Sequence, residues 1–267
     1  MSEALMIKYY NVRARRLQRL FALSLVCCLC SMCAFAQVGE HRNDLSLGFS
    51  GGYVMSSVGF VPKVPQGQHA GLTAGLTLRY TCEKYFNSIC AIVAELNYAQ
   101  LGWREDILTP DDEPVINAVT GVAEQYERDL NYIQVPVLAR LGWGRERSGL
   151  QFFFQVGPQI GAFLSEKTRQ NFAWNTMNTA DRTSLVVAQD TMAVEHKVDY
   201  GIAGGIGVEF SHRKLGHFML EGRYYYGLGD MYGNSKRDYF GRSNLSNIVV
   251  KLTYLFDLVK TRNNKIK

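Results

Sequence analysis

Strict alternation of apolar and polar residues is the first pattern along the chain. The segment AGLTAGLTLRY, residues 70–80, carries leucines, alanines and a tyrosine on one face, and glycines, threonines and Arg79 on the other. Seven further segments alternate similarly, at residues 45–55, 91–99, 131–143, 150–164, 200–210, 218–228 and 247–256. A period of two is typical of strands with one apolar and one polar face, so the sequence predicts an all-β chain of eight strands. Pro136 and Pro158 fall inside two segments, where a β-bulge would accommodate each.

The connections between these segments alternate between long and short. Residues 56–69, 103–129, 165–198 and 230–245 form long connections, and the other three connections are short turns. An even strand number with every long loop at one end is typical of outer-membrane barrels, whereas a soluble sandwich gives no reason for it. After residue 36 no stretch approaches 18 consecutive apolar residues, which excludes spanning helices there, but strands of about 9–11 residues can span as a closed sheet. The predicted fold is an eight-stranded antiparallel transmembrane up-and-down β-barrel.

The first 36 residues predict export. Five basic residues between Lys8 and Arg19 precede an apolar run from Leu20 to Ala34, and the sequence Ala-Phe-Ala at residues 34–36 offers a cleavage site. We expect residues 1–36 to be a cleaved signal peptide; a retained anchor is the alternative, although a run of about 15 residues is shorter than the roughly 20 that a transmembrane helix needs. Removing the segment leaves 24 of 29 basic and 23 of 24 acidic residues, a net charge of +1. No nucleic-acid partner is therefore expected.

Cysteine usage also changes once the signal peptide is removed. Four of the six cysteines fall within it, which leaves Cys82 and Cys90 in TCEKYFNSIC between two predicted strands. An even pair in an exported chain is typical of a disulfide, and here it would staple a short turn. Two free thiols are the alternative. A metal site is the weakest interpretation, because two thiols without a nearby histidine supply half of a tetrahedral ligand set. We predict no metal and no cofactor.

Charged residues recur on the polar face of the predicted strands. In a membrane barrel they would point into the lumen, because Arg or Lys facing lipid costs about 2–4 kcal/mol at mid-depth. An eight-stranded barrel is just wide enough to be filled by its own side chains. We therefore expect these charges, three acids and four bases, to pair with one another as an internal salt-bridge network, with a conduction or gating path as the alternative. They are Arg79, Glu95, Arg140, Glu209, Glu221, Arg223 and Lys251.

The strand segments together resemble the PorT-type outer-membrane β-barrels of Bacteroidota-like bacteria. The resemblance covers most of the chain after residue 36 and is carried by AGLTAGLTLRY, AELNYAQLGW, LNYIQVPVLARLGWG, FFFQVGPQIGAFLS, YGIAGGIGVEF, LEGRYYYGLGDM and VKLTYLF. It implies a barrel in the bacterial outer membrane, inserted by machinery that reads an aromatic last strand. The founding member is associated with protease secretion, which implies secretion components as candidate partners. We expect a barrel domain at residues 37–256 and a short periplasmic tail at 257–267.

Three functional hypotheses remain open at this stage. The first is a non-enzymatic, monomeric barrel with a structural or adhesive role, or with an accessory role in protein secretion. The second is a small porin-like channel, which a filled lumen disfavours. The third is a surface lipid- or peptide-modifying enzyme, for which His69 and His196 with Ser165 or Asp199 are the nominees. We expect no enzyme activity, because lone loop histidines are usually solvated surface residues.

The long loops are the remaining place for binding residues. The second loop has seven carboxylates between residues 105 and 127. We expect a solvated face there; the alternatives are cation bridging to lipopolysaccharide and docking of a basic partner, although no calcium-loop spacing is present. Lys236, Arg237 and Arg242 in the fourth loop are placed to contact anionic lipid head groups. Outer-membrane lipids and lipopolysaccharide are therefore expected partners.

Overall fold

The computed structural model describes residues 40–233 and 239–261. The expected signal peptide, together with Lys236 and Arg237 of the fourth loop, lies outside the described residues.

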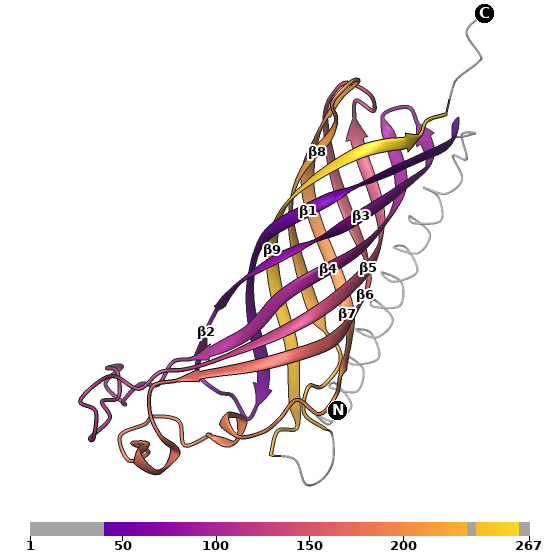
Figure 1. The fold of residues 1–267 in the computed structure, drawn as a ribbon. Helices are drawn as coiled ribbons and strands as arrows, with labels where there is room; N and C mark the ends of the chain where they lie inside the picture. Colours follow the sequence, from indigo (N-terminus) through magenta and orange to yellow (C-terminus); the bar gives the residue numbers. More distant parts are fainter. Residues whose placement is uncertain (1–39, 234–238, 262–267) are drawn as a thin grey trace, which may run out of the picture. The chain divides into compact units, whose positions relative to one another are not determined.

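Eight long strands form a closed antiparallel ring, as predicted (Figure 1). Neighbouring strands pair in the order β1–β9–β8–β7–β6–β5–β4–β3, and β3 is in turn the neighbour of β1. The short strand β2 (Gln66–Gly67) pairs with the end of β4. The long strands are β1 (Glu40–Val61), β3 (His69–Tyr85), β4 (Ser88–Glu105), β5 (Tyr126–Gly144), β6 (Gly149–Gln170), β7 (Val198–His212), β8 (Gly216–Gly227) and β9 (Arg242–Val259).

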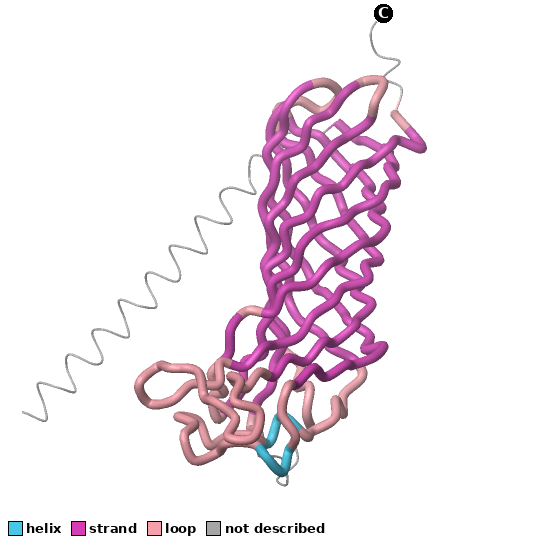
Figure 2. The backbone as a smooth tube through the Cα atoms, turned by 60° about the vertical axis from the view of Figure 1, so that its left-hand side comes forward, coloured by secondary structure: helices cyan, strands magenta, loops and turns pink. Residues whose placement is uncertain are grey.

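The connections sort the ring into a short-turn end and a long-loop end (Figure 2). The turns β3–β4, β5–β6 and β7–β8 contain two to four residues, whereas the β4–β5 loop covers residues 106–125 and the β6–β7 loop covers 171–197. The β6–β7 loop contains two short 3₁₀ helices, η1 (Trp174–Thr176) and η2 (Ala188–Asp190). No helix in the described part of the chain is long and apolar enough to cross a membrane.

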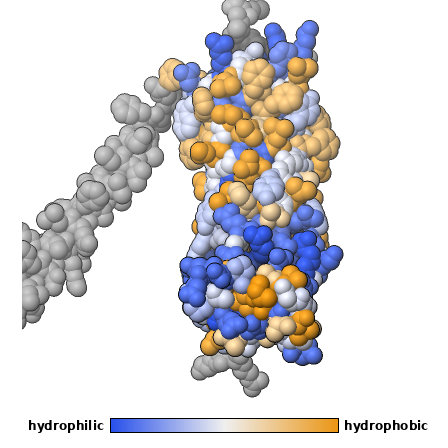
Figure 3. Space-filling view, turned by 90° about the vertical axis from the view of Figure 1, so that its left-hand side faces the viewer, coloured by the Kyte–Doolittle hydropathy of each residue, from blue (hydrophilic) through white to orange (hydrophobic). Residues whose placement is uncertain are grey.

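The apolar face of the strands points outward. Leu72, Leu76 and Leu252 expose 62%, 44% and 58% of their surface, whereas the adjacent Thr77 and Lys251 expose 0% and 2%. Figure 3 shows apolar side chains gathered over the barrel wall, with a hydrophilic belt between them and the long loops. In a soluble sandwich the apolar face would be buried, so this outward apolar face matches a lipid-facing surface. We call the exposed apolar side chains on the outer face of the strands, among them Leu72, Leu76 and Leu252, the apolar band.

The strands extend further toward the long loops than their alternation predicts. Residues 165–170, expected in a loop, continue β6, and residues 126–130 begin β5. Across this extension Glu127 pairs with Arg169 and Asp129 pairs with Lys167. The outer face there is polar, so the apolar–polar period disappears although the backbone ladder continues.

The two prolines do not produce the predicted bulges. The pairing of β5 with β6 keeps the same register from Pro136 with Gln159 to Ala139 with Val156, across the position of Pro158. The bulge of this pair lies instead between Asn131 and Tyr132. Each proline is therefore paired on one side and unpaired on the other: Pro136 has no ladder partner on β4, and Pro158 has none on β5.

The predicted disulfide is wrong: Cys82 and Cys90 are free thiols. A register shift between Thr81 and Glu83 takes Cys82 out of line and sets Glu83 opposite Cys90. A bulge adds one unpaired residue to a strand and so changes the cross-strand partner of every residue beyond it. The spacing of residues along the sequence does not show where such a bulge lies.

Candidate functional site

All seven charged residues predicted for the lumen face inward, and each exposes 7% of its surface or less. Four of them, Glu95, Glu221, Arg223 and Lys251, form a central cluster. Arg223 donates to both oxygens of Glu95 at 2.8 Å and to Glu221 at 2.6 Å. The Nζ of Lys251 lies 2.7 Å from Glu95 and 3.3 Å from Glu221. Two acids and two bases are thereby neutralised in the middle of the barrel.

The other three predicted charges meet nearer the short turns, in a mouth cluster that also contains His217 and Asp257. The Nη1 of Arg79 donates to both oxygens of Glu209 at 2.8 Å, and Arg140 bonds the same carboxylate. His217 bridges Glu209 and Asp257, at 2.6 and 3.0 Å. His217 and Asp257 were not predicted here, because one lies beside a short turn and the other falls in the expected tail.

A cavity of about 340 Å³ opens beside the mouth cluster at the short-turn end. Arg147, Arg213 and Lys260 line it together with the carboxylate of Glu146 and with four residues of the mouth cluster, Arg79, Glu209, His217 and Asp257. The lining mixes both charge signs, so this end offers a polar surface to a partner or to water.

Four aromatic residues close the lumen toward the long loops, and we call them the aromatic roof. Phe60 and Trp103 come from the wall, whereas Tyr232 and Phe240 come from the β8–β9 loop. The ring centroid of Phe60 lies 5.5 Å from that of Trp103 and 4.9 Å from that of Phe240. The ring centroids of Tyr232 and Phe240 lie 5.9 Å apart. Each of the four exposes 5% or less. The roof is therefore a packed apolar layer above the charged lumen.

Arg128 ties the β6–β7 loop to the roof. Its guanidinium donates to the backbone carbonyls of Gln189 and Met192 and lies 5.5 Å from the Trp103 ring centroid. It also bonds Glu166 at 2.6 Å. One buried cation thus fixes loop backbone that has no strand partner.

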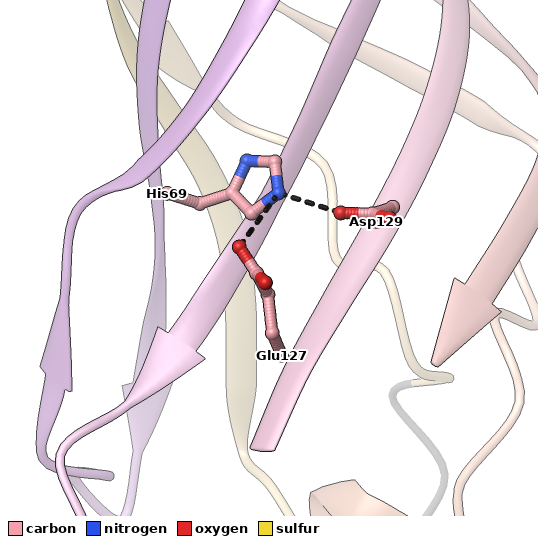
Figure 4. Close-up of side chains that lie close together, drawn as sticks. All are labelled: His69, Glu127 and Asp129. Carbon is pink, nitrogen blue, oxygen red and sulfur yellow. Dashed lines mark hydrogen bonds and ion pairs between the residues drawn. The ribbon is translucent and has the colours of Figure 1, made fainter. Parts of the chain in front are cut away.

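An outer polar cluster lies on the wall beyond the apolar band, at the long-loop end (Figure 4). The Nε2 of His69 lies 2.8 Å from Asp129 and 3.5 Å from Glu127. The ring reaches them across β4 because Gly102, the ladder partner of Asp129, has no side chain. Arg169 completes the cluster, 2.7 Å from Asp129 and 3.4 Å from Glu127.

The outer polar cluster has the donor atoms of a metal site. One nitrogen of His69 and one oxygen each of Glu127 and Asp129 lie within 4.8 Å of one another. Arg169 already occupies both carboxylates, so the four side chains as folded form an ion-pair cluster.

The four catalytic nominees are not brought together among the described residues. His69 belongs to the outer polar cluster, and His196 bonds the carbonyl of Asp230 at 2.7 Å. Asp199 accepts a hydrogen bond from Tyr225 at 2.6 Å, and Ser165 accepts one from Asn131 at 3.0 Å. No nucleophile, base and orienting acid align in these contacts.

The expectation of a solvated acidic face in the β4–β5 loop is wrong for two of its carboxylates. Glu124 exposes 5% of its surface and pairs with Arg182 of the β6–β7 loop at 2.8 Å. Glu105, at the end of β4, exposes 9%. Both are buried because the β6–β7 loop folds over them, a contact between loops that no sequence period predicts.

Comparison with known proteins gives one family and several remote structures. A family model described as an outer membrane protein beta-barrel domain matches residues 35–233. The search of curated proteins gives no match. Among solved structures, Ail, the attachment invasion locus protein of Yersinia pestis, is 14% identical, with 81% of this chain and 99% of that chain covered and a TM-score of 0.33. OprG from Pseudomonas aeruginosa is 14% identical, with 82% and 98% covered and a TM-score of 0.36. Neisserial surface protein A is 8% identical, with 79% and 97% covered and a TM-score of 0.39.

Proposed function

Because the chain belongs to the outer membrane protein β-barrel family, we propose that it is a monomeric, non-conducting and non-enzymatic barrel of the outer membrane that presents an adhesive extracellular surface. Short turns are periplasmic and long loops extracellular in such barrels. The rest of the proposal depends on what fills the lumen and on what the loops expose.

The filled lumen supports a barrel that conducts no solute. The central cluster crosses the middle of the barrel, where Glu95 of β4 and Arg223 of β8 bond from distant strands. The aromatic roof covers the extracellular end with loop residues such as Tyr232, which exposes 0%. Ions would have to break a neutralised buried network and then displace an apolar layer, and both steps are costly.

Planar-bilayer recording tests this part of the proposal. We expect the purified protein, inserted under conditions in which a known porin gives unitary steps, to give none. Reproducible steps of uniform size would contradict it and favour the porin-like channel.

An apolar hairpin tip supports an adhesive role. Ile116, Val119 and Val122 in the β4–β5 loop expose 50%, 72% and 55% of their surface. The tip is held by the bridge between Ile116 and Ala123 and by the hydrogen bond from Asn117 to the Val122 carbonyl. Apolar side chains held in the open by an ordered turn are typical of an interaction surface.

Bacteria that produce the protein provide the test, with hexadecane partition and retention on polystyrene as the measurements. We expect the triple variant Ile116→Ser, Val119→Ser and Val122→Ser to lose the adhesion that the wild type confers. The control Leu185→Ser removes an equally exposed side chain, 75% exposed, from the other long loop. Equal adhesion by the triple variant and the wild type would contradict the proposal.

An accessory role in secretion is the second candidate. The polar cavity at the periplasmic end, lined by Arg147, Arg213 and Lys260, supports it because it faces the side from which exported proteins arrive. The resemblance to PorT-type barrels favours the same role. Deletion followed by analysis of the secreted proteins separates the candidates: missing cargo favours the secretion role, and an unchanged set contradicts it.

A further inference from the structure

Two buried carboxyl groups meet beyond the apolar band, where the β6–β7 loop packs on the end of β4. Glu105 exposes 9% of its surface, and Asp190 of η2 exposes 5%. The two carboxyl groups lie close enough to interact electrostatically. Gln189 lies beside them, exposes 0% and donates to Glu105 at 2.7 Å. The outer polar cluster is a different set of residues on the opposite face of the wall.

Several oxygens at this point have no hydrogen-bond donor. Both carboxylate oxygens of Asp190 and the Oε1 of Gln189 are buried and unpartnered. The Gln189 amide cannot turn to relieve this, because its Nε2 also donates to the Val186 carbonyl at 3.0 Å. Buried polar groups nearly always have partners. Unpartnered oxygen acceptors beside two acids therefore point to a bound cation.

The neighbouring cations are already committed to other carboxylates. Arg182 pairs with Glu124 at 2.8 Å, and Arg128 pairs with Glu166 at 2.6 Å. Each of these cations therefore has its own carboxylate, and no ion pair among the described residues includes Glu105 or Asp190. Burying even one unpaired charge is costly.

We propose that Glu105, Asp190 and Gln189 form a calcium site that fastens the β6–β7 loop to the rim of the barrel. All the free donor atoms are oxygens, which calcium prefers, and two negative charges match its charge. A cavity of about 140 Å³ adjoins Glu105 and has room for water ligands; Asp106, Asp112 and Arg182 also line it. The inference is independent of the proposed adhesive function.

Calorimetric titration of the purified full-length barrel with calcium chloride, after EGTA treatment, tests the site. We expect one ion to bind with a Kd on the order of 10⁻⁴ to 10⁻³ M, as in extracellular modules, and to slow proteolysis within residues 171–197. The isosteric variant Glu105→Gln, Asp190→Asn should fold, shown by its heat-modifiable gel migration, and should lose both effects. The control Glu127→Gln, Asp129→Asn alters the outer polar cluster and should keep them.

Three results would overturn the site. The first is a wild type that takes up no calcium at any pH between 6 and 9, because the pair would then hold only a proton. The second is calcium binding that survives in Glu105→Gln, Asp190→Asn. The third is loss of binding in the outer-cluster control alone, which would move the ion to His69 and its neighbours.

Discussion

Arg223 holds two carboxylates at once, and its position shows how much of the lumen can be predicted residue by residue. Alternation along β8 places its side chain on the polar face, so its burial is predictable. Its partner Glu95 is 128 residues away in the sequence. Pairing across the lumen depends on strand tilt and stagger, and neither can be read from one strand. The contact of Asp190 with Glu105 could not be predicted either, because Asp190 lies in the β6–β7 loop, which has no periodicity.

Removing Arg223 tests the central cluster. We expect Arg223→Met to destabilise the barrel by about 3–5 kcal/mol, because Glu95 and Glu221 would then share only Lys251 in a buried site. The measurement is urea unfolding in detergent.

Arg169→Met is the matched control, since the Arg169 side chain is 54% exposed. Exposed pairs contribute about 1 kcal/mol or less. If both variants lost the same free energy of unfolding, the central cluster would contribute no more to stability than an exposed ion pair, which would contradict the prediction. The double variant Glu95→Gln, Arg223→Met should recover part of the loss, because it removes one unpaired charge.

The acidic pair at the loop gives a pH dependence whose sign follows from the raised pKa of Glu105, about 9. Without calcium, the folded protein retains a proton that the unfolded chain releases above about pH 4.3. This contribution to the free energy of unfolding is present at low pH and is lost as the pH rises toward 9. Unfolding of the EGTA-treated wild type between pH 5 and 9 should show the decline, and Glu105→Gln, Asp190→Asn should show a flatter profile.

At the scale of elements, all eight strands were predictable because the membrane imposes a strict period of two on them. Where the outer wall leaves the apolar band, the period disappears, and the ends of β5 and β6 were missed. The predicted disulfide failed because a bulge at Cys82 changes the register without changing the sequence pattern.

Gly102 tests the extension of the wall beyond the apolar band. A Cβ there would lie 2.0 Å from the Arg128 carbonyl oxygen, and its φ of +152° disfavours other residues. We expect Gly102→Ala to cost on the order of 1–3 kcal/mol and to increase hydrogen exchange where β4 meets β5, near the outer polar cluster. Gly222→Ala is the control, because a Cβ there would meet nothing within 4 Å. Unchanged exchange in Gly102→Ala would contradict the role of Gly102 at this rim.

At the scale of the whole molecule, the sequence predicted which face of the strands points toward lipid. It predicted only in part how the lumen is closed. The inverted distribution, with leucines outward and ions inward, follows from alternation together with the lipid cost of charge. The aromatic roof was missed because Tyr232 and Phe240 lie in a loop. Loops without a period give no sign of whether they cover a barrel or extend from it.

Spin labelling of adjacent residues tests sidedness and closure together. Cys82→Ser, Cys90→Ser in a chain that starts after residue 36 gives a suitable background, because the other four cysteines lie within residues 1–36 and neither remaining thiol is in a disulfide. Single labels at Leu76, Thr77, Leu252 and Thr253 in a lipid bilayer would be compared for collisions with oxygen, which dissolves in lipid, and with a water-soluble nickel chelate. We predict that both leucine positions collide with oxygen and not with nickel, and that both threonine positions are immobilised and collide with neither. Nickel collisions at the threonine positions would mean a water-filled lumen, and nickel collisions at the leucine positions would contradict a lipid-facing wall.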